Sequence, residues 1–472
     1  MTDRLDDNGV SHNAVPFRVG VTVMPEWFAY EGIDAVLDRV EALGATAIAT
    51  SPYVLEEAPD GIGAREPPLD AGAGSVRPLD RALFGRHALW VRTAPSFEHD
   101  FARYRGLRYQ PSPPDELTRR QSDLIDNVVQ RASERGVVVY LQVMAASPPG
   151  YRVQFSSAND DDACLGPDGR RHDQRVDRNA SLASAHVGAY TATLVAELAQ
   201  RYPDVHGFRL DWPEYPPYDF RSALFDFHPS AKALMEARGN PPSRAAFDVL
   251  AWGEALRREV VRDPSSAFDG EIWCAAFDAR GPFAALREAK QDAVLALVAR
   301  VRAALDALPG PRRRLELQAF PPPLHMFSGF PFDRLTGLVD AVGIKLYTMH
   351  WPMIARFWAR DLVGTSLHLE DDASVALARA FGFVDARVAA NELHYPEPGE
   401  RHPVGERAQI AKIESAIALA GDVPVIAFAH TYGPLDDVAQ RACLAASSGA
   451  PVWLNRYGYL SNAKIAALGA VL

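Results

Sequence analysis

Short apolar segments rich in β-branched and aromatic residues alternate along the chain with segments of helical periodicity, and this alternation constrains the fold most strongly. Strands separated by helices form a parallel sheet with right-handed crossovers. The helical patterns lie at 33–43, 115–135, 184–201, 282–308, 406–420 and 462–468. The eight predicted strands lie at 17–23, 46–53, 137–144, 205–211, 315–320, 340–347, 423–430 and 452–457.

Eight strand–helix units favour a closed barrel over an open sheet. No glycine-rich motif of the GxGxxG or GxxxxGKS/T type follows the early strands, which counts against a nucleotide-binding open sheet. We therefore predict an α/β fold, a (β/α)8 TIM barrel. It forms a single domain over residues 17–472, after a flexible N-terminal segment over 1–16.

Long connections follow the second, third, fourth and sixth predicted strands, at 54–113, 147–181, 215–280 and 352–402. All four would lie at the C-terminal face of a barrel, where active sites are built. We therefore predict lid-like insertions around a site at the strand C-termini. The first should fold over the barrel mouth, and it carries Arg65, Arg86, Trp90, Tyr104 and Tyr109.

The balance of charges excludes several classes of partner. The 472 residues carry 49 Lys and Arg against 60 Asp and Glu, a formal net charge of −11, which argues against nucleic acid and anionic membranes as partners. No export-type leader and no apolar stretch of about 18 residues is present. Three widely spaced cysteines give no disulfide framework. These features predict a cytoplasmic protein whose substrate is small or intracellular, and they leave the oligomeric state open.

The segment HGFRLDWPEYP, residues 206–216, gives the strongest chemical signal. Strand alternation places Arg209 and Asp211 on one face, with Asp211 at the strand end. Pro213 ends regular pairing, and a bulge there would turn Glu214 toward the same mouth. Two carboxyl groups at one site are what glycoside hydrolysis needs. The other interpretation is an aspartate that caps the next segment and a glutamate paired with an arginine.

The same segment resembles a known family signature. GFRLDWPEYP is similar to the strand-four signature DGxDxDWEYP of the chitinase-type family 18 glycoside hydrolases, with an extra residue at Pro213. The resemblance places Asp211 on the last aspartate and Glu214 on the acid that protonates the leaving group. Tyr347 in KLYTMHW resembles the tyrosine of that family's strand six, and Thr348 stands where the family has an aspartate.

Two further resemblances point to sugar-active barrels. GFRLD, residues 207–211, is similar to the GFRxD of the α-amylase family, where the aspartate is the nucleophile, although no aspartate follows His430 in strand seven. The run from Arg178 through Tyr190 to the fourth strand, with the closing RYGYL at 456–460, resembles poorly characterised glycosidase-like barrels. The implied fold is a glycoside-hydrolase-like barrel.

From these patterns we predict Asp211 as nucleophile or electrostatic partner and Glu214 as general acid, kept protonated by burial beside Trp212 and Tyr215. Arg209 and Lys345 would hold Asp211 ionised. Asn391-Glu392 resembles the Asn-Glu pair of retaining glycosidases, so Glu392 is a candidate second carboxylate. The other predicted substrate-binding residues lie near strand ends and are Glu26, Trp27, Arg209, Trp212, Tyr215, Lys345, Tyr347, His350, Trp351, His430, Tyr432 and Asn455.

The favoured function is hydrolysis or transfer at a glycosidic bond, with a carbohydrate substrate, no cofactor and no metal. One alternative is a metal-dependent sugar isomerase or lyase, in which His350 and His430 would bind a divalent ion with Asp211 or Glu214. No HxH, HExxH or calcium-loop pattern supports it. Another alternative is a carbohydrate-binding barrel without catalytic activity.

Overall fold

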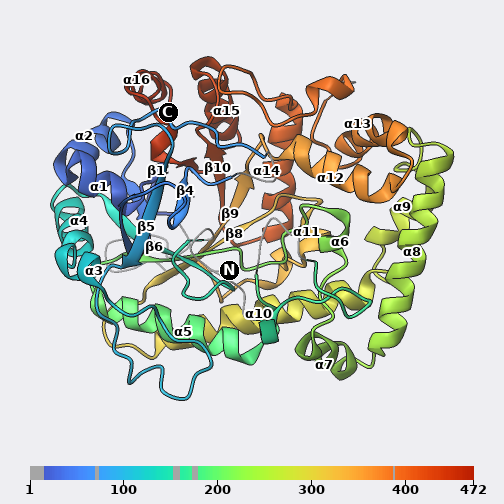
Figure 1. Ribbon diagram of the computed structural model, residues 1–472, viewed down its shortest axis with the longest axis horizontal. Helices are drawn as coiled ribbons and strands as arrows, with labels where there is room; N and C mark the ends of the chain where they lie inside the picture. The colour runs from blue at the N-terminus through green and yellow to red at the C-terminus, as the bar shows by residue number, and fades with distance from the viewer. Residues whose placement is uncertain (1–14, 70–73, 153–159, 173–178, 386–387) are drawn as a thin grey trace.

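The computed structural model describes residues 15–69, 74–152, 160–172, 179–385 and 388–472, so most of the predicted segment 1–16 lies outside it. Eight parallel strands close into a barrel surrounded by helices (Figure 1), which confirms the predicted TIM-barrel fold. The strands follow one another around the ring in chain order, and β11 pairs with β1. They are β1 (Val19–Thr22), β2 (Ala47–Thr50), β6 (Val138–Met144), β7 (Gly207–Asp211), β8 (Arg314–Ala319), β9 (Ala341–Leu346), β10 (Val425–His430) and β11 (Val452–Asn455).

Large aromatic side chains fill the lower part of the barrel. Trp453 and Phe428 stack there with ring centroids 5.7 Å apart, and both are fully buried. Neighbouring strands carry glycine where these rings lie. A Cβ at Gly20 would lie 2.2 Å from the Trp453 ring, and one at Gly343 would lie 2.1 Å from the Phe428 ring. The barrel interior is therefore a packed core, and a ligand site can lie only at its ends.

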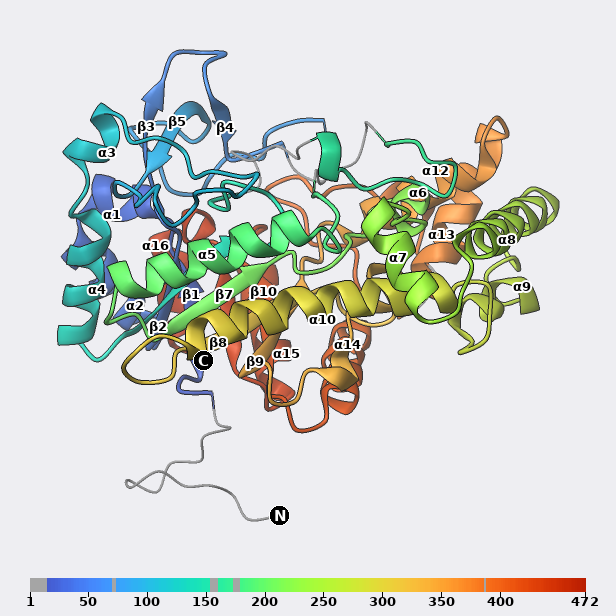
Figure 2. The same cartoon turned by 90° about the horizontal axis from the view of Figure 1, so that it is seen from below.

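Helices cover the outside of the barrel close to the predicted positions. The predicted 115–135 segment is two helices, and a short helix not predicted, α1 (Pro25–Glu31), follows β1. Figures 1 and 2 show α5 and α10 side by side against the barrel. The covering helices are α2 (Ile33–Ala42), α3 (Glu116–Arg120), α4 (Leu124–Glu134), α5 (Ala185–Arg201), α10 (Ala284–Asp306), α14 (Glu406–Ala420), α15 (Leu435–Ser447) and α16 (Asn462–Gly469).

The insertion over 54–113 contains a small antiparallel sheet of order β3-β5-β4. In Figure 2 this sheet stands at the top of the molecule, on the opposite side from the segment that enters β1. Its position is therefore at the C-terminal ends of the barrel strands, the face required by the predicted lid. The strands are β3 (Tyr53–Ala58), β4 (Ala64–Glu66) and β5 (Leu89–Pro95).

The insertions after β7 and β9 are largely helical and form an extension beside the barrel, on the right in Figure 1. Aromatic contacts join the two insertions: Trp358 lies 6.3 Å from Trp273 and 5.5 Å from Phe220 between ring centroids. No helix among the described residues is long and apolar enough to span a membrane. The helices are α6 (Phe220–Ala223), α7 (Pro229–Ala237), α8 (Pro242–Arg262), α9 (Glu271–Cys274), α12 (Trp351–Val363) and α13 (Glu370–Ala380).

Candidate functional site

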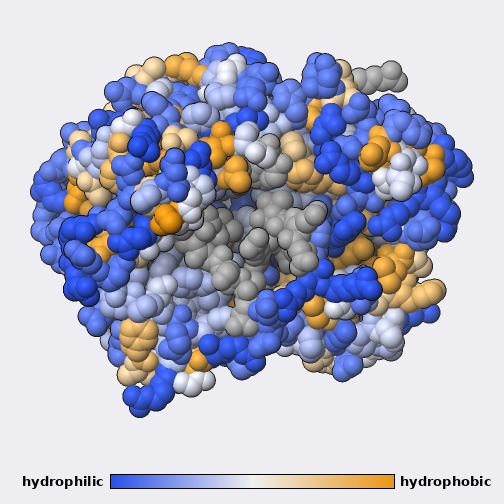
Figure 3. All heavy atoms as spheres, in the orientation of Figure 1, coloured by the Kyte–Doolittle hydropathy of each residue, from blue (hydrophilic) through white to orange (hydrophobic). Residues whose placement is uncertain are grey.

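A cavity of about 160 Å³ lies at the C-terminal ends of the barrel strands. Figure 3 shows this face of the molecule, where hydrophilic residues predominate and hydrophobic residues are scattered among them. Residues from seven barrel strands or the loops after them, including the insertions after β2, β6 and β7, form its walls. The lining residues are Met24, Ser51, Pro68, Leu69, Gln142, Met144, Tyr151, Arg152, Asp211, Trp212, Tyr218, Tyr347, Met349, His350, His430, Asn455 and Arg456.

Asp211, the last residue of β7, presents its carboxylate to this cavity. Lys345 Nζ lies 3.1 Å from Asp211 Oδ1, and Gln142 Nε2 donates a hydrogen bond of 3.2 Å to Oδ2. Gln318 in turn donates to Gln142 Oε1 at 2.9 Å. Three neighbouring strands therefore fix the orientation of one carboxylate, and Asp211 is the only Asp or Glu among the described residues that line the cavity.

Glu214 lies beneath the cavity and does not line it. Its side chain is fully buried and lies 3.6 Å from Lys345 Nζ. Both oxygens already accept hydrogen bonds, from the Phe320 backbone N–H at 2.8 Å and from the Ser328 hydroxyl at 2.7 Å. Burial raises the pKa of Glu214 to about 7, against the opposing effects of Lys345 and these hydrogen bonds. The structure thus brings Glu214 close to the Asp211–Lys345 pair without exposing it to a substrate.

The chain turns after β7 at Trp212, whose φ of 55° lies in the left-handed region. This conformation is unusual for a bulky residue and needs support from the surroundings. The Trp212 ring lies 6.0 Å from that of Tyr218, and Lys345 Nζ lies 5.3 Å from its centroid. The change of direction that we expected as a bulge at Pro213 therefore occurs one residue earlier, and it places Trp212 at the cavity and Glu214 below it.

Polar side chains from β9, β10 and β11 form the wall opposite. Asn455 Nδ2 donates to the Tyr347 hydroxyl at 3.1 Å, and the Tyr218 hydroxyl lies 3.0 Å from His350 Nδ1. The Tyr432 backbone N–H donates to His430 Nδ1 at 3.1 Å. Because Nδ1 of a neutral His430 accepts that bond, its ring proton is on Nε2. Four of the predicted residues, Tyr347, His350, His430 and Asn455, are thereby brought together around the cavity.

A second charged group lies where the first insertion meets β11. Arg152 Nη1 lies 2.9 Å from Glu66 and 3.3 Å from Glu26, and Arg456 Nη2 lies 2.6 Å from Glu66. The Tyr53 hydroxyl donates to Glu26 at 3.0 Å. Burial raises the pKa of Glu26 to about 7, opposed by Arg152. The predicted Glu26 is thus close to the cavity, where the two arginines and not the glutamates form the surface.

Arg209 does not contact Asp211, so the prediction that it holds this carboxylate ionised is wrong. Its side chain is fully buried deeper in the barrel and forms an ion pair of 2.5 Å with Glu316. The guanidinium also lies 3.7 Å from the centroid of the Trp453 ring. Arg209 and Asp211 do lie on the same face of β7, as strand parity predicted. Arg209 is two residues earlier in the strand, however, so its side chain meets the packed core and Glu316 of the neighbouring strand β8.

Five other predicted residues do not line the cavity. Trp27 packs edge-on against Tyr457, and Trp351 stacks on Phe383. The Tyr432 hydroxyl donates to the Pro396 carbonyl. The predicted second carboxylate, Glu392, is exposed in a short 3-10 helix (Ala390–Glu392). Tyr215 is buried and does not line the cavity either.

Sequence reasoning missed Gln142, Arg152, Tyr218 and Arg456. A glutamine in the otherwise apolar segment VVVYLQVM was a usable signal, because a buried amide needs partners. Arg152 had no such signal, since its partners lie 86 and 126 positions away in the chain. The alternative metal site is not assembled either: the described residues contain no group of three or more His, Cys, Asp or Glu side chains placed to hold an ion.

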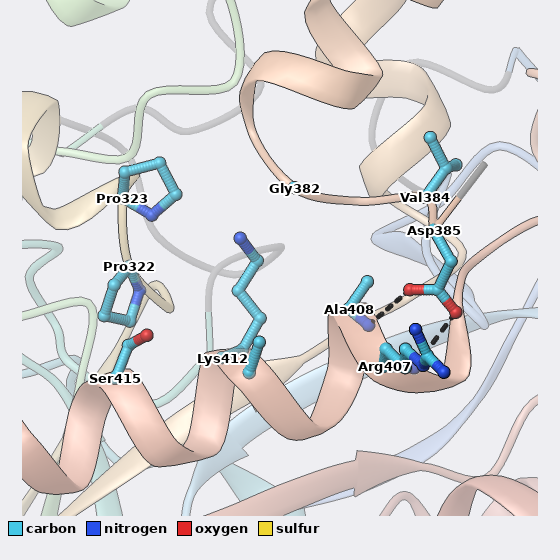
Figure 4. A pocket seen from close by; sticks show the side chains of 10 residues that line it. Pro322, Pro323, Gly382, Val384, Asp385, Arg407, Ala408, Lys412 and Ser415 are labelled. Atoms are coloured by element: carbon cyan, nitrogen blue, oxygen red, sulfur yellow. Dashed lines mark hydrogen bonds between the residues drawn. The ribbon is translucent and has the colours of Figure 1, made fainter. Parts of the chain in front are cut away.

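A second hollow, of about 430 Å³, lies on the side of the barrel (Figure 4). Lys412 reaches toward it from α14 and donates to the Phe381 carbonyl. Asp385 caps the same helix by accepting from the backbone N–H groups of Arg407 and Ala408, at 3.0 and 2.7 Å. Because no residue of a barrel strand lines this hollow and its one carboxylate is committed to the helix, we place the candidate site at the smaller cavity.

No protein-family model and no curated protein sequence matches the chain. Solved structures similar to it include glycoside hydrolases. The PgaB (BpsB) glycoside hydrolase domain from Bordetella bronchiseptica is 12% identical over 97% of this chain and 99% of that one, with a TM-score of 0.49. The catalytic domain of β-amylase from Paenibacillus polymyxa is 10% identical over 97% and 99%, also with a TM-score of 0.49.

The β-galactosidase from the psychrophilic Marinomonas ef1 is 10% identical over 93% of this chain and 54% of that one, with a TM-score of 0.48. All three TM-scores lie below 0.5. One barrel fold supports many chemistries, so the activity depends on the residues of the site.

Proposed function

We propose that the protein cleaves a glycosidic bond and passes the glycosyl group to water or to another acceptor, with Asp211 as the reacting carboxylate. The observation that carries the proposal is the placement of Asp211. Its carboxylate lines a strand-end cavity while Lys345 and Gln142 fix it from below. A positioned carboxylate anion stabilises or attacks the oxocarbenium-like centre that forms during glycoside cleavage.

The cavity walls suit a sugar ring. Trp212, Tyr218 and Tyr347 supply aromatic surface, and Asn455 and His430 supply hydrogen-bonding groups beside it. Ligand sites of this kind combine apolar and aromatic walls with a few fixed polar groups. A cavity of about 160 Å³ is small compared with the roughly 300–1,000 Å³ of drug-sized pockets. We infer that it receives a single terminal sugar residue.

The leaving oxygen also needs a proton donor. Glu214 has the raised pKa of a general acid, but its two oxygens are bonded to Phe320 and Ser328 below the cavity. His430 lines the cavity and carries its proton on Nε2. We therefore assign to His430 a hydrogen bond from Nε2–H to the leaving oxygen, which takes its proton from water. Glu214 becomes a positioning residue that acts on Asp211 through their shared Lys345.

The first experiment is a panel of aryl glycosides, with Asp211→Asn as the test variant and the exposed Glu392→Gln as its matched control. Cleavage of at least one glycoside by the wild type and by Glu392→Gln, and a loss with Asp211→Asn, supports the proposal. If the wild type binds sugars but cleaves none, the alternative of a binding barrel holds. Unchanged turnover after dialysis against a chelator argues against the metal-dependent alternative.

A second experiment separates the contributions of His430 and Glu214 at the leaving oxygen. We expect His430→Gln to lower kcat on the order of 10²-fold for a poor leaving group, because removing one fixed hydrogen-bond donor from a developing oxyanion costs about that much. The loss should shrink for a dinitrophenyl leaving group, which needs no proton. The same dependence on the leaving group in Glu214→Gln, and not in His430→Gln, would return the role of the acid to Glu214.

A further inference from the structure

Two guanidinium groups share one carboxylate at the edge of the candidate cavity. Glu66 lies 2.9 Å from Arg152 and 2.6 Å from Arg456. Both arginines line the cavity, while Glu66 is buried behind them. A single carboxylate can neutralise only one of two guanidinium charges, so this wall carries excess positive charge unless another acid balances it.

Glu26 is the other acid of this group, and it is a poor counter-ion near neutral pH. It is fully buried, bonded to the Tyr53 hydroxyl and adjacent to Arg152, and its pKa is raised to about 7 by burial. Across the cavity the charges of Lys345 and Asp211 balance each other. The guanidinium wall is thus the place where the cavity would attract an anion.

The two arginines differ in their freedom to bind a ligand. Arg152 is held by three groups, Glu26, Tyr53 and Glu66. Arg456 donates from Nη2 to Glu66, and the described residues accept no hydrogen bond from its Nε or Nη1. Its side chain is 14% exposed, and its position at the end of β11 is fixed by a bond of 3.0 Å from its backbone N–H to the Thr431 hydroxyl. Arg456 therefore has donors left for a ligand.

We propose that Arg456, held by Glu66 and backed by Arg152, is a subsite for an acidic substituent on the sugar that the cavity receives. An arginine with free donors matches the planar oxygens of a carboxylate, sulfate or phosphate. The inference rests on the proposed function for the sugar itself. It narrows the substrate class to carbohydrates whose terminal residue is a uronic acid or a sugar sulfate or phosphate.

The test measures binding of free monosaccharides, which have no glycosidic bond to cleave. Titration calorimetry on the wild type compares glucuronate and galacturonate with glucose and galactose, and the 6-sulfates and 6-phosphates of both hexoses form separate arms. We expect at least one acidic sugar to bind about tenfold or more tightly than its neutral parent, because a charge-assisted hydrogen bond is worth that much. The arm that shows the effect identifies the acidic group.

Arg456→Gln should remove that preference and leave the affinity for the neutral sugar within about twofold. Arg86→Gln is the matched control, since Arg86 pairs with Glu57 on the small sheet and is 56% exposed. Arg456→Lys keeps the charge and should retain part of the preference. If Arg456→Gln fails to fold, Arg456→Lys takes its place as the test variant. A second measurement then uses the wild type, which should bind the acidic sugar more weakly at high salt.

Equal affinity for acidic and neutral sugars, or an equal loss of both in a folded Arg456 variant, would overturn the subsite. Because these measurements need no turnover, a barrel that binds acidic sugars but cleaves nothing would support the subsite while refuting the proposed hydrolysis. Cleavage of neutral glycosides without tighter binding of any acidic sugar would support the proposed hydrolysis and refute the subsite.

Discussion

The two walls of the cavity use the same kinds of charged residue in opposite arrangements. On the side of β7 and β9, Lys345 is buried and the carboxylate of Asp211 faces the cavity. On the side of the first insertion and β11, Glu66 is buried and the guanidinium of Arg456 faces it. The first arrangement suits reaction at a developing positive centre, and the second suits recognition of an anion. The member of each ion pair that faces the cavity thus determines which chemistry that wall can support.

The largest effect that separates the walls should appear in kinetics. Once a cleaved acidic glycoside is known, Asp211→Asn should lower kcat on the order of 10³-fold, because it removes charge stabilisation from the transition state. Arg456→Gln should act mainly through KM, because it removes a contact made in both ground and transition states. Steady-state kinetics on both variants checks this. A fall in kcat alone for Arg456→Gln would mean that the two walls are not functionally distinct.

Removing the buried cation of the reaction wall should be the next largest effect. Lys345→Met leaves two carboxyl groups, Asp211 and Glu214, without their common partner, so we expect the free energy of unfolding to fall by about 3 kcal/mol or more. Lys412→Met is the matched control, because the described residues give its ammonium only the Phe381 carbonyl as a hydrogen-bond acceptor. It should cost about 1 kcal/mol. Urea unfolding of both variants measures the difference, and equal losses would show that the carboxylates do not depend on Lys345.

The smallest effect concerns pH. The pKa of Glu214 is raised from its ordinary 4.5 to about 7, so the folded protein binds this proton more tightly than the unfolded chain does. The group therefore contributes stability that is fully present below about pH 4.5 and is lost as pH rises through about 7. Glu214→Gln cannot titrate, and its stability should fall less between pH 5 and pH 8, by about 2 kcal/mol. Thermal or urea unfolding at both pH values, with Glu392→Gln as control, tests this; identical pH slopes would contradict it.

Prediction from the sequence succeeded where the signal was local. The period of apolar residues located all eight strands, because a strand buried on both faces must be apolar wherever it lies in the barrel. Predictions for the connections were less complete, since 215–280 and 352–402 are mostly helical and pack through aromatic residues such as Trp273 and Trp358. The period of apolar residues in a helix does not show which surface of another insertion that helix packs against.

The candidate site shows the same division. Strand parity placed Asp211 at the strand end, and the spacing of KLY placed Lys345 beside it, as the ion pair of 3.1 Å shows. Parity could not indicate that Trp212 adopts a left-handed conformation, which puts Glu214 beneath the cavity. Nor could it pair Arg209 with Glu316, because that contact depends on the register between β7 and β8.

The barrel, the end of the barrel where a site would form, and the carboxylate at its centre could all be predicted from the amino-acid sequence. These features follow from short-range periodicity, which survives in any compact arrangement of the strands. Which charged group of each pair faces the cavity depends on long-range packing. Residues 66, 152 and 456 meet through barrel closure and the path of the first insertion, and the burial that sets their charges arises only when those distant segments pack together.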